Sequence, residues 1–220
     1  MIKIDNVEIV GWEAAIRGMR NPKNSWTQSD SDYVASCDGA GKQFAIGAKD
    51  LKLMKVLANA GSDHGKFLRM ITVYADITAP LYWYKEYDTY KIGTVADSCS
   101  TMHKIAAKEF TLDDFSYEHL LDDCGNHLID TITLLNTYRD KYNNAIQEKM
   151  SPESIKLYWW QMIQLLPSSY NQRRTVQLNY AVLRNMYHAR KYHKLDEWRD
   201  FCAWVETLPY AELITGENNE

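Results

Sequence analysis

The sequence lacks the features that mark several classes of protein. Its four cysteines form no Cys-x-x-Cys pair, which argues against a disulfide frame or a zinc site and fits reduced thiols. No apolar run approaches the roughly 20 residues that a membrane-spanning helix needs. The first residues alternate in character and include acids, so we expect no signal peptide and a cytoplasmic protein. With a net charge of -4 and a pI near 5.9, the chain lacks the broad basic face that binds duplex nucleic acid, although a single nucleotide needs only a local cluster.

Side chains that could bind a metal or act as a nucleophile are few. His119, Asp123 and His127 recur every four residues and would share one helical face, but a solvated acidic face explains them more simply, and we predict no metal site. Cys99 lies in a polar segment near His103, where a thiolate nucleophile is conceivable. Without a demonstrated base, an ordinary free thiol is the simpler interpretation.

The composition is that of an ordinary globular protein. A chain of 220 residues that is 45% hydrophobic can bury a sizeable core, and we predict one domain over residues 1–215 with a disordered tail at 216–220. Aromatic residues are abundant, with 15 Tyr and 7 Trp. They indicate a core and a subunit interface first, and a platform for a flavin or a base as the alternative.

Periodicity and turn signals give a coarse order of elements. Strands are expected over residues 2–10 and 67–75, and a long loop over 24–47. Helices are expected over residues 12–19, 50–59, 81–90, 111–147 and 151–166. Gly125 is a potential break in the long helix, whose start at Thr111 resembles a capping box. This order predicts an α+β fold with a central sheet and a helix-rich C-terminal half.

The stretch from Leu166 to Arg190 carries the most information. We interpret it as a helix with Asn179, Met186 and Arg190 along one stripe and Asn185 on its flank. Amide and guanidinium groups beside apolar residues are costly when buried without partners. They should therefore reach solvent or contact a polar ligand.

The same stretch resembles a known family. Its residues are Leu166-Pro167, Asn179, Leu183, Asn185, Arg190 and then Leu195-Asp196-Glu197-Trp198. In this order and spacing they resemble the C-terminal motif of the flavin-dependent thymidylate synthases. Upstream, Asp63-His64 looks like the family's Glu-His step into its central sheet, and residues 79–84 are similar to the helix before the family's signature.

The chain departs from the family at that signature. Where the family has Arg-His-Arg followed by a serine, residues 85–90 read Lys-Glu-Tyr-Asp-Thr-Tyr. Ser98-Cys99-Ser100 stands nearest to the family's Ser-x-Arg element, and Ile163 replaces an arginine before Leu166-Pro167. Arginine forms bidentate hydrogen bonds to phosphate that these replacements cannot reproduce, which argues against an unchanged nucleotide substrate.

The resemblance implies a flavoprotein that acts on a pyrimidine nucleotide. It implies FAD, with NADPH and methylenetetrahydrofolate as co-substrates, a homotetramer, and transfer of a methyl or hydroxymethyl group to the nucleotide. The alternative is a catalytically inactive relative that serves as a scaffold for binding a nucleotide or another protein. By resemblance the flavin contacts are His64, Asn179 and Asn185, the catalytic residue is Arg190, and the nucleotide contacts are Lys85, Tyr87, Ser98, Ser100 and Arg190.

Overall fold

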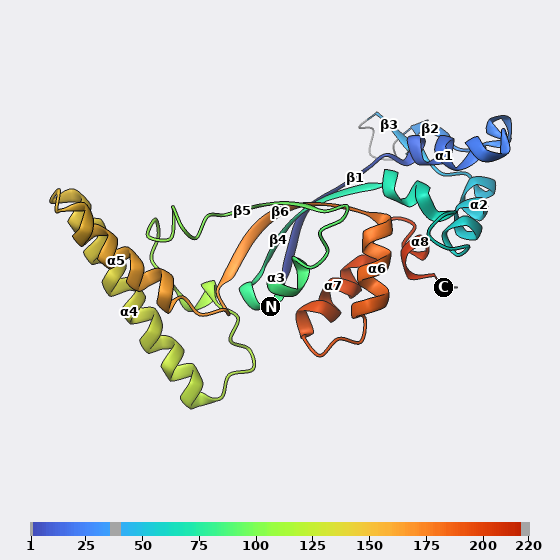
Figure 1. Cartoon of the computed structure of the whole chain (residues 1–220). Helices are drawn as coiled ribbons and strands as arrows, with labels where there is room; N and C mark the ends of the chain where they lie inside the picture. Colours follow the sequence, from blue (N-terminus) through green and yellow to red (C-terminus); the bar gives the residue numbers. More distant parts are fainter. Residues whose placement is uncertain (1, 36–40, 217–220) are drawn as a thin grey trace. The chain divides into compact units, whose positions relative to one another are not determined.

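The chain forms a mixed helix and sheet structure (Figure 1), seen in a computed structural model that describes residues 2–35 and 41–216. Cys37 and the tail from residue 217 lie outside the described residues. The strands are β1 (Lys3–Val10), β2 (Asp32–Ala35), β3 (Lys42–Ala45), β4 (Thr72–Pro80), β5 (Val95–Ser98) and β6 (Asn171–Asn179). The α-helices are α1 (Trp12–Arg20), α2 (Ala48–Ala58), α3 (Leu81–Tyr87), α4 (Asp122–Gln147), α5 (Pro152–Leu165), α6 (Tyr180–Arg190), α7 (Asp196–Glu206) and α8 (Glu212–Thr215). Short 3-10 helices are η1 (Asn21–Lys23), η2 (Trp26–Gln28), η3 (Gly65–Met70) and η4 (Leu112–Asp114).

A four-stranded antiparallel sheet has the order β1-β4-β6-β5. This confirms the predicted α+β class with a central sheet. The chain divides into two compact units: unit 1 comprises residues 1–3, 77–89 and 97–174, and unit 2 comprises residues 4–76, 90–96 and 175–220. The single domain over residues 1–215 stays a prediction.

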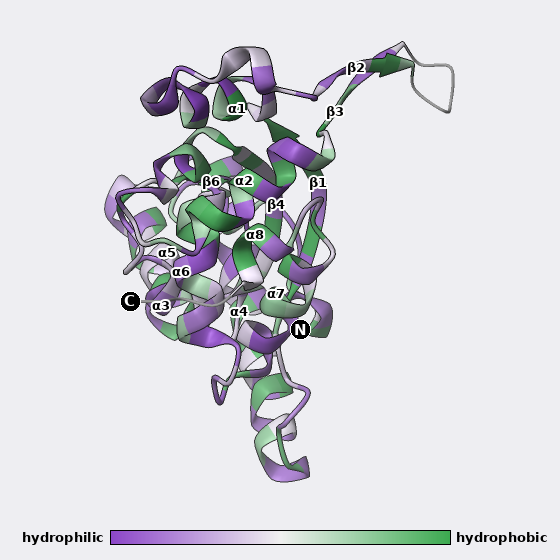
Figure 2. Cartoon of the chain, turned by 90° about the vertical axis from the view of Figure 1, so that its right-hand side faces the viewer, coloured by the Kyte–Doolittle hydropathy of each residue, from purple (hydrophilic) through white to green (hydrophobic). Residues whose placement is uncertain are grey.

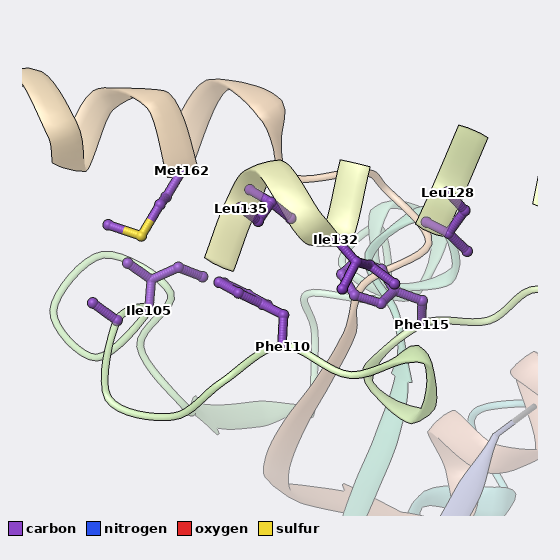
Figure 3. Packing of buried hydrophobic residues seen from close by; sticks show 8 residues of the cluster. Ile105, Phe110, Phe115, Leu128, Ile132, Leu135 and Met162 are labelled. Atoms are coloured by element: carbon purple, nitrogen blue, oxygen red, sulfur yellow. The ribbon is translucent and has the colours of Figure 1, made fainter. Parts of the chain in front are cut away.

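Unit 1 has its core beside a helical hairpin. Helices α4 and α5 pack against each other, and the segment before them closes the apolar cluster (Figure 3). Full burial of a Leu, Ile or Phe side chain stabilises a fold by about 1.5–3 kcal/mol. The buried cluster consists of Ile105, Ala106, Phe110, Phe115, Leu128, Ile132, Leu135 and Met162.

Unit 2 is built around α6. This helix packs against η3, α7 and α8, and α1 packs against η3. The inner face of α6 buries Leu183 and Met186. Helix α7 contributes the fully buried rings of Trp198 and Phe201, which meet edge to face. The helix that carries Asn185 and Arg190 is therefore anchored by packing along most of its length.

The predicted loop over residues 24–47 is wrong where strands β2 and β3 form. Strands β2 and β3 pair antiparallel there, with Tyr33 opposite Phe44 and their rings 5.2 Å apart, and Figure 2 shows the hairpin extending beyond α1. All four residues of β2 are exposed, so this strand lacks the alternation of buried and exposed side chains on which sequence-based strand prediction depends. Ring packing across the two strands replaces burial as the stabilising contact.

The predicted helix from Leu166 to Arg190 is also wrong in its first half. Residues Asn171–Asn179 form strand β6, whose Val176 and Leu178 are buried, and the helix begins only at Tyr180. Asn179 caps α6, because its Oδ1 accepts a hydrogen bond of 3.0 Å from Val182 N. Asn179 and Arg190 therefore lie at opposite ends of α6, about three turns apart, with Asn179 as the cap and not within the helix.

Three other boundaries differ from the sequence prediction. The strand expected over 67–75 is η3 followed by β4, since a short apolar run does not distinguish a turn of helix from a strand. The helix expected over 81–90 ends at Tyr87. The helix expected from residue 111 begins only at Asp122, and the capping box of Thr111 and Asp114 instead opens η4. Gly125 does not break α4, where it lies in the first turn and donates its N–H to Leu121 O at 2.8 Å.

Candidate functional site

The guanidinium of Arg190 is fixed by two aromatic residues of unit 2. Arg190 Nε donates a hydrogen bond of 2.9 Å to the hydroxyl oxygen of Tyr90. The guanidinium carbon lies 5.1 Å from the ring centre of Trp198 and 5.6 Å from that of Tyr90. Such cation–π contacts contribute about 0.5–2 kcal/mol, and the position at the C-terminal end of α6 also favours a cation. Arg190 is half-buried, so its orientation is set while part of its surface faces solvent.

Asn179 joins the start of α6 to the segment that carries Tyr90. Its Nδ2 donates to Gly93 O at 3.3 Å, while its Oδ1 caps the helix. Gly93 has a φ of +79°, and a Cβ there would lie only 2.8 Å from Asn179 Nδ2, so the contact requires glycine at this position. The side chain predicted to contact a flavin thus already holds residues 90–96 against α6.

His64 and Asn185 present polar groups at the surface of unit 2. Both are exposed. His64 directly precedes η3, and η3 packs against α6, which carries Asn185. An imidazole and a primary amide on adjoining elements supply the donors and acceptors that the edge of a flat heterocycle requires.

Arg184 of the same helix has a structural role. It is 5% exposed, and its guanidinium donates to Leu213 O at 2.9 Å and to Asn59 Oδ1 at 3.0 Å. Its neighbour His188 has a lowered pKa, because burial and then the positive charge of Arg184 disfavour the imidazolium. These groups fasten α8 and the end of α2 rather than forming a phosphate site.

The remaining predicted nucleotide contacts lie in unit 1 and differ in accessibility. Lys85 and Ser98 are exposed. Tyr87 is 2% exposed and its ring stacks on Trp83 at 5.1 Å. Burial raises its pKa, so the hydroxyl stays protonated. Ser100 Oγ accepts a hydrogen bond from His103 N at 3.0 Å. Nucleotide binding by these residues stays a prediction.

An arginine that sequence reasoning did not assign organises the same unit. Arg174 lies 3.7 Å above the ring centre of Tyr84, and its NH1 donates to Asp88 Oδ1 at 2.7 Å. Arg174 Nε donates to Gln172 Oε1, and Gln172 Nε2 donates to Cys99 O. This chain of contacts links α3 to the segment around Cys99.

Other site types are not seen in the part of the chain that the structure describes. Over residues 2–35 and 41–216, no base is hydrogen-bonded to the Cys99 thiol, and no three His, Cys, Asp or Glu side chains are placed to bind a metal. Within the same ranges no helix is both long and apolar enough to cross a membrane.

Sequence reasoning missed the pairing of Tyr90 with Arg190. The two residues are 100 positions apart, so no local pattern connects them. Trp198 was noted as part of the C-terminal motif, but its position under the guanidinium depends on the turn between α6 and α7. Apart from the fact that residue 93 is a glycine, nothing in the sequence indicates that it adopts a positive φ.

Comparison with known proteins identifies the fold. No family model and no curated protein sequence matches the chain. A crystal structure of the flavin-dependent thymidylate synthase ThyX from Helicobacter pylori with FAD and dUMP matches at 17% identity and a TM-score of 0.64, covering 96% of this chain and 98% of that one. A second structure of the Helicobacter pylori enzyme with FAD and dUMP gives 16% identity and a TM-score of 0.65, covering 98% of each chain.

A different enzyme also matches over nearly the whole chain. The UMP/dUMP methylase PolB from Streptomyces cacaoi, bound with 5-Br dUMP, has 13% identity and a TM-score of 0.56, covering 98% of this chain and 95% of that one. At these identities the similarity is one of backbone architecture. The chain has the fold of the flavin-dependent thymidylate synthases.

Proposed function

We propose that this protein binds FAD and transfers a one-carbon unit, methyl or hydroxymethyl, to a pyrimidine nucleotide. NADPH is the proposed reductant and methylenetetrahydrofolate the proposed carbon donor, with a cytoplasmic homotetramer as the working form. The fold match supports this, because two structures with the same architecture hold FAD with dUMP, and a third holds 5-Br dUMP.

The fixed guanidinium of Arg190 is the observation that carries the proposal. A pyrimidine nucleotide offers carbonyl oxygens and a phosphate, and both accept hydrogen bonds from a guanidinium. Tyr90 and Trp198 hold Arg190 before any ligand arrives, so little conformational entropy is lost on binding. A positive charge beside a base carbonyl would also stabilise negative charge that develops on the ring during attack at carbon.

The residues of unit 2 fit a flavin. His64 and Asn185 are exposed polar side chains on adjoining elements, and Asn179 Nδ2 retains a second hydrogen beyond its bond to Gly93. These three would hold the polar edge of the isoalloxazine ring. A bound flavin supplies hydride chemistry.

The test is turnover by the purified full-length protein. FAD, NADPH and methylenetetrahydrofolate are supplied with dUMP, UMP, dCMP or CMP, and the product is identified by mass spectrometry as methylated or hydroxymethylated nucleotide. We expect Arg190→Lys to lose most of the activity, because lysine keeps the charge but not the planar donor fork. Arg17→Lys is the matched control, since Arg17 is exposed and forms a surface ion pair with Glu13. Equal activity of Arg190→Lys and wild type would contradict the role of Arg190.

The alternative function is an inactive scaffold. It is favoured by two observations in unit 1: Tyr87 is buried, and Ser100 Oγ already accepts a backbone hydrogen bond. A protein that binds nucleotide in calorimetry but modifies none of the four would support this alternative.

A further inference from the structure

A surface pocket in unit 2 has a lining rich in hydrogen-bond donors. It lies where the end of α1, the short helices η1 and η2 and the first turns of α2 meet. None of its lining residues is acidic. They are Arg20, Lys23, Ser25, Gln28, Lys49 and Leu53.

We propose that this pocket binds a phosphate group, either as the free ion or as the end group of a phosphate monoester. The proposal concerns a site other than the Arg190 cluster and does not depend on flavin binding or catalysis. Its basis is the charge and the hydrogen-bonding state of the groups that line the pocket.

Arg20, which lines the pocket, is held from behind by a buried ion pair with Asp50. Arg20 is 4% exposed and Asp50 is fully buried, and Arg20 Nε donates to Asp50 Oδ1 at 2.6 Å. The other guanidinium nitrogens donate to Ser25 O at 3.2 Å, to Ser25 Oγ at 3.3 Å and to Gln28 O at 3.2 Å. Arg20 therefore fixes the loop that carries Ser25 and Gln28 before any ligand binds.

The carboxylates of Asp50 and Asp30 already accept hydrogen bonds from groups of the protein. Asp50 Oδ2 accepts from the hydroxyls of Ser29 and Ser31 and from two backbone N–H groups. Burial alone would raise the pKa of Asp50, but the hydrogen bonds from the two serines and Arg20 outweigh it and lower the pKa. Asp30 accepts from Lys49 N and Asp50 N at the start of α2. Neither acid lines the pocket.

The groups that remain at the pocket are donors. The ammonium groups of Lys23 and Lys49 form no ion pair with any residue that the structure describes, and both side chains are exposed. Ser25 Oγ accepts from Arg20, so its own hydrogen is available to donate. The Gln28 amide adds two N–H donors.

This set matches a dianion better than a neutral ligand. Two ammonium groups balance the charge of a phosphate, and the hydroxyl and amide satisfy further oxygens through charge-assisted hydrogen bonds. Leu53 adds one apolar wall, which suits the carbon next to a phosphate ester. The preformed contacts of Arg20 reduce the ordering that binding requires.

Isothermal titration calorimetry of the full chain with inorganic phosphate tests the proposal. Sodium chloride at matched ionic strength is the reference, and phenyl phosphate distinguishes an ester from the free ion. We expect saturable phosphate binding that is about tenfold weaker in the Lys23→Gln/Lys49→Gln variant, as expected when charge-assisted contacts are lost. Lys52→Gln is the matched control, since Lys52 is an exposed lysine of α2 outside the pocket.

Each outcome decides the proposal. Tighter binding of phenyl phosphate than of phosphate would support an ester as ligand, and the reverse would support the free ion. No saturable binding of either probe, or equal binding by wild type and the double variant, would overturn the proposal. The titration is repeated in the presence of saturating FAD. Loss of phosphate binding there would assign the pocket to the flavin site and overturn its independence.

Discussion

The buried pair of Arg20 and Asp50 should dominate the stability of unit 2 around α2. Asp50→Asn replaces one carboxylate oxygen by an NH2 group. That group would face either the Arg20 donor, at the position of Oδ1, or the hydroxyl donors of Ser29 and Ser31, at the position of Oδ2. Breaking a buried pair by changing one partner costs about 3–5 kcal/mol. We expect Asp50→Asn to lie in this range. Arg20→Met should cost a similar amount, because it leaves the fully buried carboxylate without a counter-charge and removes the hydrogen bonds to Ser25 and Gln28.

Urea unfolding followed by circular dichroism measures both variants, and Arg17→Met is the control. Arg17 forms a surface pair with Glu13, and such pairs contribute about 0–1 kcal/mol. The folded pKa of Asp50 lies below its ordinary value of 3.8, so its stabilisation is complete above that pH and is lost as the pH falls through the lowered pKa. A loss below about 1 kcal/mol for Asp50→Asn at neutral pH would refute this reasoning.

Three further changes have defined outcomes. Tyr90→Phe keeps the ring beside Arg190 but removes its hydrogen-bond acceptor, so nucleotide affinity measured by calorimetry should fall about tenfold, and an unchanged affinity would contradict the positioning role. Asn179→Ala removes the cap on Val182 N and should lower the free energy of unfolding by about 1 kcal/mol in urea denaturation, whereas Asn179→Ser should recover most of it. Leu135→Ala opens a cavity in the core of unit 1 and should cost about 2–5 kcal/mol by the same assay; a loss under about 1 kcal/mol would mean that α4 packs loosely there.

The sequence predicted a helix best where local start signals agreed. The helix that follows Ser151-Pro152 is confirmed, because a serine cap and a proline at the first helical position both mark its start. Strand β1 is confirmed at Lys3–Val10, although its burial pattern is irregular and Asn6 adopts a positive φ. Strand β5 was missed, since its four residues are all exposed and only pairing within the sheet defines it.

Around Asn179 the predicted helix is a strand followed by a helix. Val176 and Leu178 are two residues apart, which fits one face of a strand. The prediction instead places all residues from Leu166 to Arg190 on one helix. The cap at Asn179 separates the two elements, and a capping asparagine before an apolar helical run is a recognisable start signal. The pairing of Tyr90 with Arg190, by contrast, depends on the tertiary fold and had no local signal.

We propose that the protein binds a flavin through His64, Asn179 and Asn185. The most direct measurement is an FAD titration of the purified full-length protein, followed by flavin absorbance and fluorescence, in wild type, Asn185→Ala and Arg17→Ala. We expect saturable binding by wild type and Arg17→Ala, and weaker binding by Asn185→Ala. No FAD binding by wild type, or equal binding by all three proteins, would contradict the proposal.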